Sequence, residues 1–306
     1  MATSARRKSA AFSPARMSAL EEPAWRVLLG RLGERAWRTL CVLGPMDAGK
    51  TTLCRFLGQV LSEQYCTAVV DCDPGQSVIG PPACLGLGWE PWRGGEPVAL
   101  RLVGASTPAR HFLQTLSGIR RLGDLALALG AERLIFDASG YDDSPAGREF
   151  QHQVVDLLQP EHLVALQRSG EMEPLLASFT RRARPRIHRL AVSSAATART
   201  PAARRRYREE RFAAYLQRAR SQELGVKDTG FHGMIPVLRD RRSYRKRLIG
   251  LCDERGFIMS IGILEELDVD AGRLRVYAPP FEHDRLASVQ FGSLHLNRAG
   301  QELRPD

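Results

Sequence analysis

The sequence contains few cysteines and no long apolar run. Its six cysteines form no C-x-x-C pair and lie mostly in apolar stretches, at positions 41, 54, 66, 72, 84 and 252. Such spacing favours neither a zinc site nor a disulfide framework, so we expect reduced, mostly buried thiols in a cytoplasmic protein. No stretch approaches the ~18 uncharged apolar residues of a membrane helix. Arg6, Arg7 and Lys8 are followed by Ser, Ala and Pro rather than an apolar core, which argues against a secretory signal. We therefore expect no membrane partner.

Lysine is also scarce, because only four of the 44 basic residues are lysines. The formal net charge is +10, but it is unevenly distributed. Between Thr180 and Gly250 there are 20 basic and 5 acidic residues, an excess of +15, and the rest of the chain carries −5. A neutral-to-acidic body with one strongly basic segment indicates a surface that faces a polyanion.

The pattern of apolar residues predicts alternating strands and helices in the first two thirds of the chain. The 306 residues allow one large domain or two smaller ones. Residues 1–20 are basic and rich in Ser and Ala, which indicates a disordered tail or, alternatively, an organellar presequence. Strands are expected at 39–43, 67–70, 98–103, 134–136 and 162–166, and helices at 50–64, 111–129 and 148–158. This alternation predicts an α/β fold with a mostly parallel sheet flanked by helices.

The last third of the chain breaks this rhythm. Residues 204–224 are expected to form an arginine-rich helix, and residues 225–242 a loop. Strands are then predicted at 247–252, 257–263 and 273–277. The pattern predicts a small β-rich element at the C-terminal end.

A phosphate-loop pattern, G-x-x-x-x-G-K-[ST], follows the first predicted strand and opens a helix. Glycines let backbone N–H groups surround a triphosphate, Lys50 can reach the β- and γ-phosphates, and the Thr51 hydroxyl can bind Mg²⁺. The alternative is an ordinary glycine-rich turn with an exposed lysine. The predicted nucleotide-binding residues are Gly44, Pro45, Met46, Asp47, Ala48, Gly49, Lys50, Thr51 and Thr52.

Two carboxylates, Asp71 and Asp73, follow the second predicted strand in the segment D-C-D-P-G-Q. Carboxylates at this place beside a phosphate loop can bind a metal ion and accept a proton. The same segment is also a good turn sequence, so a purely structural role is the alternative. With Thr51, these two residues are the predicted metal ligands.

Together these motifs resemble the polynucleotide 5′-hydroxyl kinase family. That family includes the kinase subunit of the eukaryotic pre-mRNA 3′-end cleavage factor and the nucleolar kinase of pre-rRNA processing. The resemblance extends from about Trp25 to Pro279 and rests above all on D-x-D-x-G-Q, here Asp71 to Gln76. The absence of large extra domains suggests a compact, prokaryotic type of member.

Two further segments resemble the family's nucleic-acid contacts. Gly104-Ala-Ser-Thr-Pro108 is similar to its T-P clasp, with Thr107 near the transferred phosphate, although the family's usual Asn is His111 here. A helix N-cap at Ser106 or Thr107 is the local alternative. Where the family has T-x-G-W, this chain has Ser139, Gly140 and Tyr141. Tyr141 could stack on a base or pack in the cleft wall. With Gln76, these residues are the predicted substrate contacts.

The segment around residues 199–215 resembles the family's mobile lid. The resemblance implies that Arg199, Arg204 and Arg208 are its catalytic arginines. Guanidinium groups can neutralise the charge on a transferring phosphoryl group. A solvated helix face is also arginine-rich, which is the alternative for any one of them.

The sequence thus predicts an ATP- and Mg²⁺-dependent kinase acting on the 5′-hydroxyl end of RNA or DNA, with RNA favoured over DNA. Asp73 would accept the proton, and Lys50 and the lid arginines would stabilise the phosphoryl group. The alternative is a non-catalytic, regulatory phosphate-loop ATPase that switches between partners. The expected divisions are a tail (1–20), a phosphate-loop kinase domain (21–192), an arginine-rich lid (193–225) and a C-terminal β-rich region (226–306).

Overall fold

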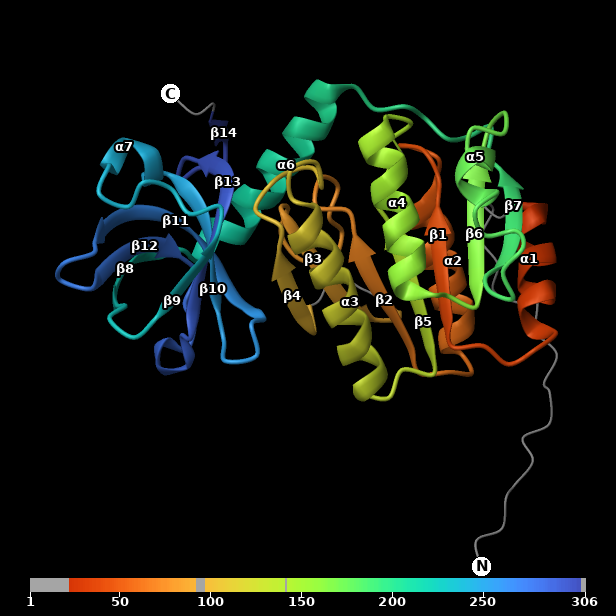
Figure 1. The fold of residues 1–306 in the computed structure, drawn as a ribbon, viewed down its shortest axis with the longest axis horizontal. Helices are drawn as coiled ribbons and strands as arrows, with labels where there is room; N and C mark the ends of the chain where they lie inside the picture. Colours follow the sequence, from red (N-terminus) through yellow and green to blue (C-terminus); the bar gives the residue numbers. More distant parts are fainter. Residues whose placement is uncertain (1–21, 92–96, 141, 304–306) are drawn as a thin grey trace, which may run out of the picture. The chain divides into compact units, whose positions relative to one another are not determined.

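The computed structural model of the chain describes residues 22–91, 97–140 and 142–303 (Figure 1). The described part of the chain divides into two compact units, one that ends at Arg35 and one that begins at Ala36. In the first unit, Pro23–Gly33 forms helix α1, which the sequence analysis did not predict. Pro23 begins this helix, where its missing N–H group costs no hydrogen bond. The predicted N-terminal tail lies outside the described residues. No helix in the described ranges is long and apolar enough to cross a bilayer.

The second unit begins with a seven-stranded sheet in the order β4-β3-β2-β5-β1-β6-β7. Only β3 runs against its neighbours β2 and β4, and the other neighbouring pairs are parallel. The strands are β1 (Thr39–Leu43), β2 (Thr67–Cys72), β3 (Cys84–Trp89), β4 (Ala99–Leu102), β5 (Arg133–Ala138), β6 (His162–Gln167) and β7 (Arg186–Ala191). Central strands such as β2 are buried along their whole length, which explains their continuous apolar character.

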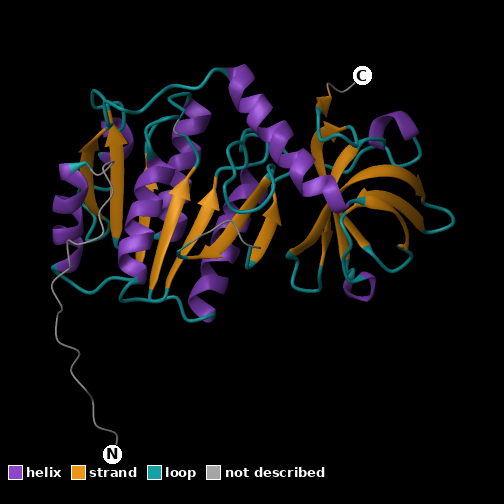
Figure 2. Ribbon diagram, turned by 180° about the vertical axis from the view of Figure 1, so that it is seen from behind, coloured by secondary structure: helices purple, strands orange, loops and turns teal. Residues whose placement is uncertain are grey.

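Helices cover both faces of this sheet, with α3 and α4 on one face and α2 on the other (Figures 1 and 2). Each helix presents apolar residues at helical spacing, such as Leu53, Leu57 and Leu61 in α2. The helices of this part are α2 (Lys50–Ser62), α3 (Phe112–Ala128), α4 (Pro145–Leu158) and the short α5 (Glu173–Leu176).

A second sheet follows, in the order β14-β13-β10-β11-β12-β8, and β9 pairs in parallel with β13. Its strands are β8 (Arg220–Gly225), β9 (Gly230–Gly233), β10 (Arg247–Cys252), β11 (Ile258–Asp268), β12 (Arg273–Ala278), β13 (Ser288–Leu296) and β14 (Glu302–Leu303). Helix α6 (Pro201–Tyr215) precedes it, and α7 (Arg241–Tyr244) lies between β9 and β10. The predicted β-rich C-terminal element is therefore present, and it is larger than expected.

One apolar cluster joins the two sheets through helix α6. Phe212 is fully buried and packs with Leu102 of β4 and Leu248 of β10. Backbone contacts add to this joint, because Ser293 and Leu294 of β13 both donate N–H groups to the carbonyl oxygen of Gly104, at 2.8 and 3.0 Å. The segment that follows β4 is therefore fixed from both sheets.

The structure corrects several expected elements. The helix expected over 204–224 is wrong at its C-terminal end, because α6 ends at Tyr215 and Arg220–Gly225 forms β8. The expected loop at 225–242 contains β9. Strands β3, β7, β13 and β14 were not predicted.

Candidate active site

Four sequence motifs meet at one edge of the first sheet. The phosphate loop follows β1, whereas the D-x-D segment begins in the last two residues of β2 and the Asp137–Gly140 segment in the last two residues of β5. These three strands are adjacent and parallel, so their carboxyl ends lie together. The clasp segment follows β4, which points the same way because two antiparallel pairings separate it from β2.

The phosphate loop closes around its own lysine. Lys50 is only 7% exposed, and its Nζ donates to the carbonyl oxygens of Gly44 and Pro45, at 3.1 and 2.9 Å. Burial lowers the pKa of the Lys50 ammonium, while the nearby charges of Asp137 and Asp73 oppose that shift. Gly49 caps helix α2 in a left-handed conformation, with φ at +86°. The first N–H groups of α2 therefore remain available to an anion at the helix N-terminus.

The two D-x-D carboxylates have different environments. Asp71 is buried, and both its oxygens accept backbone N–H groups, Oδ1 from Asp73 at 3.1 Å and Oδ2 from Val78 and Ile79 at 2.5 and 3.0 Å. Burial and the charge of Asp137 raise the pKa of Asp71 to about 7. Through these contacts, Asp71 fixes the conformation of the loop over residues 73–79. Its role as a metal ligand stays a prediction.

Asp73 is held by one oxygen only. Its Oδ1 accepts the N–H groups of Gly75 and Gln76, at 2.8 and 3.1 Å, and its Oδ2 has no hydrogen-bond partner within the described ranges. The side chain is half-buried. A carboxylate that is oriented by two backbone donors and keeps one oxygen free can accept a proton from a bound hydroxyl.

Asp137, at the end of β5, is a site residue that the sequence analysis did not assign. Its carboxyl is buried between Thr51, which donates a hydrogen bond, and the charges of Lys50 and Asp73. Burial raises its pKa to about 6. Its Oδ1 is a buried oxygen that no group in the described residues satisfies. An aspartate directly after a strand adjacent to the phosphate-loop strand was the signal that could have identified it.

The clasp lies against the D-x-D segment. A Cβ atom on Gly75 would come within 2.5 Å of the carbonyl oxygen of Ser106, so only glycine permits this close approach. Thr107 is exposed, and its Oγ1 accepts the N–H of Ala109 at 3.3 Å. The alternative of a helix N-cap at Ser106 or Thr107 is wrong, because α3 begins at Phe112 with His111 as its N-cap.

His111 stands where the family has Asn, and it contacts the second sheet instead. It is 3% exposed, and its Nε2 lies 2.9 Å from the Ser293 hydroxyl of β13. Burial lowers the pKa of this imidazole, which favours the neutral form. The side chain therefore links the clasp to β13.

The predicted base-contact segment is only partly described. The Ser139 hydroxyl is buried and lies 3.4 Å from Gln151 Nε2. A Cβ on Gly140 would collide with Met46 of the phosphate loop, which explains the glycine. Tyr141 lies outside the described residues. The substrate roles of these three residues stay predictions.

The lid contacts the phosphate loop through Asp47. Asp47 Oδ2 accepts the backbone N–H of Arg199 at 2.9 Å and the guanidinium of Arg204 at 2.6 Å. These two contacts lower the pKa of Asp47 against the opposing effect of burial. Arg199 also donates to Gln76 Oε1 at 3.0 Å, so the lid contacts the D-x-D segment as well. The structure thus places Arg199 and Arg204 at the rim of the phosphate loop.

Arg208 points elsewhere. It forms a two-bond ion pair with Glu302 of β14, at 2.5 and 2.9 Å, and both side chains are almost buried, at 13% and 12% exposure. On the same helix, Tyr207 donates to the carbonyl of Ser77, and Arg211 to those of Val78 and Gly80. Helix α6 is therefore fixed to the phosphate loop, the D-x-D segment and the C-terminal strand.

These features define the class of the protein. A phosphate loop opens α2, acidic groups follow the adjacent strands, and a basic helix covers the rim, which is the arrangement of a phosphate-loop protein that binds a nucleoside triphosphate.

Comparison with known families agrees with this class. The chain belongs to the family described as mRNA cleavage and polyadenylation factor CLP1 P-loop, which matches residues 44–218. The resemblance stated from the sequence and the predicted fold class are confirmed.

Several archaeal proteins called polyribonucleotide 5′-hydroxyl-kinase are similar over most of the chain. The protein of Pyrococcus horikoshii is 24% identical, and the match covers 87% of this chain and 88% of that protein. The one of Thermococcus kodakarensis is 25% identical, with 87% and 90% covered. The one of Methanocaldococcus jannaschii is 23% identical, with 86% and 88% covered.

Among solved structures, a chain of the wild-type Clp1p–Pcf11p complex shares the fold. Its TM-score is 0.66 at 14% identity, and the match covers 89% of this chain and 77% of that one.

Proposed function

We propose that this protein transfers the γ-phosphoryl group of ATP to the 5′-hydroxyl end of a polyribonucleotide. The observation that carries the proposal is the free Oδ2 of Asp73, whose charge acts on the Lys50 ammonium of a phosphate loop that also binds two lid arginines through Asp47. The archaeal relatives, named for this activity and similar over most of their length, support it.

The proposed chemistry begins with binding of the triphosphate. Backbone N–H groups of the loop and of the first turn of α2 receive the phosphates, and Lys50 leaves the carbonyls of Gly44 and Pro45 to contact them. In the complex, the phosphates replace the carbonyl oxygens of Gly44 and Pro45 as hydrogen-bond partners of the buried Lys50 ammonium. Asp73 Oδ2 accepts the proton of the 5′-hydroxyl as its oxygen attacks the γ-phosphorus.

The lid supplies positive charge where the transferring group develops negative charge. Arg199 and Arg204 lie at the loop rim, and their partner Asp47 belongs to the loop itself. A phosphoryl group competes with Asp47 for the guanidinium of Arg204 and with Gln76 for that of Arg199. Arg208 contributes only if it leaves Glu302.

Mg²⁺ fits the donor set at the same place. The Thr51 hydroxyl and the unsatisfied Oδ1 of Asp137 are hard oxygen ligands of the kind this ion prefers, and Asp73 Oδ2 stays free to accept the proton. When bound, the ion neutralises charge on the phosphate oxygens. Asp71 supports these groups by fixing the loop.

RNA rather than DNA is the proposed substrate, because the archaeal relatives carry polyribonucleotide in their names. A cytoplasmic location is part of the proposal and is supported by six cysteines that are all free thiols, five of them buried.

The test is transfer of label from γ-labelled ATP to a 5′-hydroxyl oligoribonucleotide, with the same oligomer carrying a 5′-phosphate, and a 5′-hydroxyl DNA, as comparisons. We expect labelling of the 5′-hydroxyl RNA only, and none with Lys50→Ala. The fold of this variant should persist, because Lys50 is the first residue of α2 and its ammonium is held by two loop carbonyls rather than by the apolar core. Hydrolysis of ATP without labelling of any 5′-hydroxyl end would favour the regulatory ATPase.

A further inference from the structure

A second basic site lies in the C-terminal sheet. A cavity of about 620 Å³ opens there between β8, β11, β12, the end of β13 and the segment at 241–246. Its lining includes five cationic side chains and a single carboxylate, a formal charge of +4: Arg241, Arg245, Lys246, Glu265, Arg275 and Arg298. None of these residues takes part in the candidate active site.

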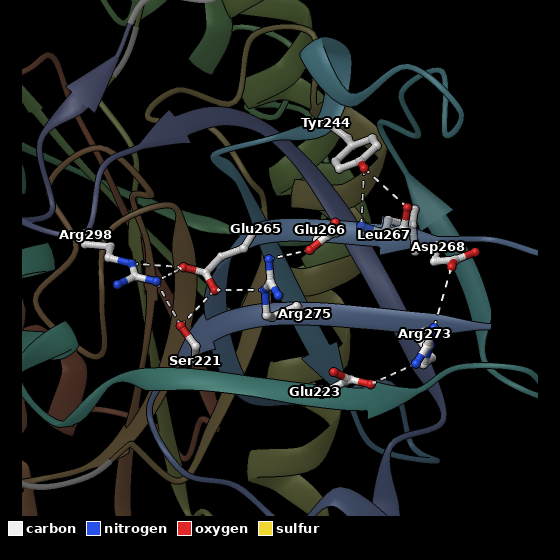
Figure 3. A network of polar contacts seen from close by, with 10 residues as sticks. All are labelled: Ser221, Glu223, Tyr244, Glu265, Glu266, Leu267, Asp268, Arg273, Arg275 and Arg298. Atoms are coloured by element: carbon white, nitrogen blue, oxygen red, sulfur yellow. Dashed lines mark hydrogen bonds and ion pairs between the residues drawn. The ribbon is translucent and has the colours of Figure 1, made fainter. Parts of the chain in front are cut away.

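The carboxylate is already neutralised within the cavity. Figure 3 shows Glu265 on β11 between Arg298 and Arg275, with the Ser221 hydroxyl donating to it at 2.8 Å. Arg298 Nε donates to Glu265 at 2.9 Å, and Arg275 Nε lies 3.8 Å away. Glu265 is 16% exposed, so it acts as a fixed internal counter-ion for Arg298, whereas Arg275 also forms a closer ion pair with Glu266.

The other three cations have no such partner. The side chains of Arg241, Arg245 and Lys246 are exposed and form no ion pair or hydrogen bond within the described part of the chain. Three unpaired positive charges line the same cavity, whereas the charges on an ordinary solvent-exposed helix face lie farther apart. Such a field attracts a ligand with several negative charges.

Lys246 has a strained backbone. Its φ is +66°, in the left-handed region that favours glycine. Two hydrogen bonds fix this conformation, since its N–H donates to Leu264 and its carbonyl accepts from Leu296, both at 2.8 Å. A lysine at such a position, in a chain with only four lysines, indicates that the side chain is needed there.

We propose that this cavity binds phosphodiester groups of the polynucleotide backbone, away from the 5′ end that is phosphorylated. The proposal rests on the proposed function for the identity of the ligand. Guanidinium forks match phosphate oxygens, and backbone phosphates are a sequence-independent ligand with the required repeated charge. The three unpaired cations lie in the basic segment Thr180–Gly250, whose other arginines include those of the lid.

The test combines substrate length with removal of charge. The double variant Arg245→Gln/Lys246→Gly removes two unpaired cations, and Lys227→Ala removes an exposed lysine outside the cavity as the matched control. We measure phosphorylation of a 5′-hydroxyl trinucleotide and of a 20-nucleotide RNA. We expect KM for the long RNA to rise roughly 5- to 10-fold, with KM for the trinucleotide and both kcat values unchanged.

Binding measured without catalysis separates this proposal from the proposed function. Fluorescence anisotropy with a labelled 20-nucleotide RNA bearing a 5′-phosphate needs no phosphoryl transfer. We expect the slope of log K against log salt to become shallower by about 1.4 in the double variant, because each phosphate that a cation neutralises on a single strand adds ~0.7 to that slope. The control should keep the wild-type slope. Lys246→Gly alone should unfold at the wild-type temperature or higher, because it relieves the left-handed strain.

Two results would overturn the proposal. One is an equal KM rise for the short and long substrates, which would mean that the cavity acts through the active site. The other is an unchanged salt slope and unchanged RNA affinity in the double variant, which would leave an acidic protein as the ligand.

Discussion

At the scale of the residue, the structure distinguishes two carboxylates that the sequence presents as a pair. Asp71 gives both oxygens to backbone N–H groups, whereas Asp73 keeps Oδ2 free. Asp73→Asn preserves size and removes basicity. We expect phosphoryl transfer to fall about 10²-fold or more while nucleotide binding largely persists, because a positioned general base contributes on that scale.

Asp71→Asn is the matched comparison. Its amide NH₂ would face backbone donors, so we expect a loss of about 1–3 kcal/mol in the free energy of unfolding, the usual cost of an unsatisfied buried group. Transfer at saturating ATP and Mg²⁺ should fall less than in Asp73→Asn. Oligonucleotide phosphorylation over a Mg²⁺ series, with thermal unfolding of both variants, measures these effects. If Asp73→Asn transfers the phosphoryl group at the wild-type rate, Asp73 is not the general base.

The buried acids also predict how stability depends on pH. Burial raises the pKa of Asp71 to about 7 and that of Asp137 to about 6, well above an unfolded value near 4. The folded state then binds more protons than the unfolded state between pH 4 and 7, so stability falls as pH rises through this window. We expect the unfolding temperature of the nucleotide-free protein to decrease from pH 5 to 7.

Asp137→Asn tests that assignment, because it removes one of the two titrating groups. The slope of unfolding temperature against pH between 5 and 7 should become shallower in this variant. A slope equal to that of the wild type would show that Asp137 ionises in the folded protein as it does when unfolded.

At the scale of the element, the lid helix depends on a nearly buried ion pair at its far side. Glu302→Gln leaves the Arg208 guanidinium without its counter-charge, and we expect a loss of about 1–3 kcal/mol in stability. Asp270→Asn, which breaks the 80%-exposed pair with Arg239, should change almost nothing. Thermal unfolding measures both, and limited proteolysis within 193–200 should be faster in Glu302→Gln alone. Equal behaviour of the two variants would mean that β14 does not hold the lid.

Sequence patterns predicted the elements whose periodicity is simple. The strands at 39–43 and 247–252 have the expected bounds, because each is a short, largely buried apolar run. Residues 220–225 alternate exposed and buried side chains at an edge of the second sheet, and their charged residues continue the composition of the preceding helix. That continuity explains why the sequence predicts a helix that extends past Tyr215 into β8.

The site was predictable where a motif fixes backbone geometry and not where contacts come from distant segments. The phosphate loop and the D-x-D segment lie where the pattern put them. The pairing of Arg204 with Asp47 joins residues 157 positions apart, and that of Arg208 with Glu302 joins residues 94 positions apart. No local spacing encodes such partners, so the sequence could identify the arginines but not what holds them.

At the scale of the whole molecule, the second sheet supports the clasp through two glycines. Gly104 is the first residue of the clasp segment, and Gly292 lies in β13. A Cβ on Gly292 would come within 2.7 Å of both the Cα and the carbonyl oxygen of Gly104. These are backbone atoms, so no side-chain rotation can relieve the clash. The carbonyl of Gly104 also accepts two N–H groups of β13, so moving it breaks these bonds as well.

Gly292→Ala therefore tests whether the C-terminal sheet contributes to catalysis through this joint. We expect a loss of about 1–3 kcal/mol in stability, the usual cost of overpacking, and a raised KM for the oligonucleotide, because displacement of Gly104 moves Thr107. Gly225→Ala is the control, since a Cβ there meets no atom within 4 Å. Thermal unfolding and kinetics with varied oligonucleotide at saturating ATP measure both effects. If Gly292→Ala loses stability but keeps the wild-type KM, the second sheet stabilises the fold without positioning the clasp. The second sheet would then contact the substrate only through the cavity at Lys246.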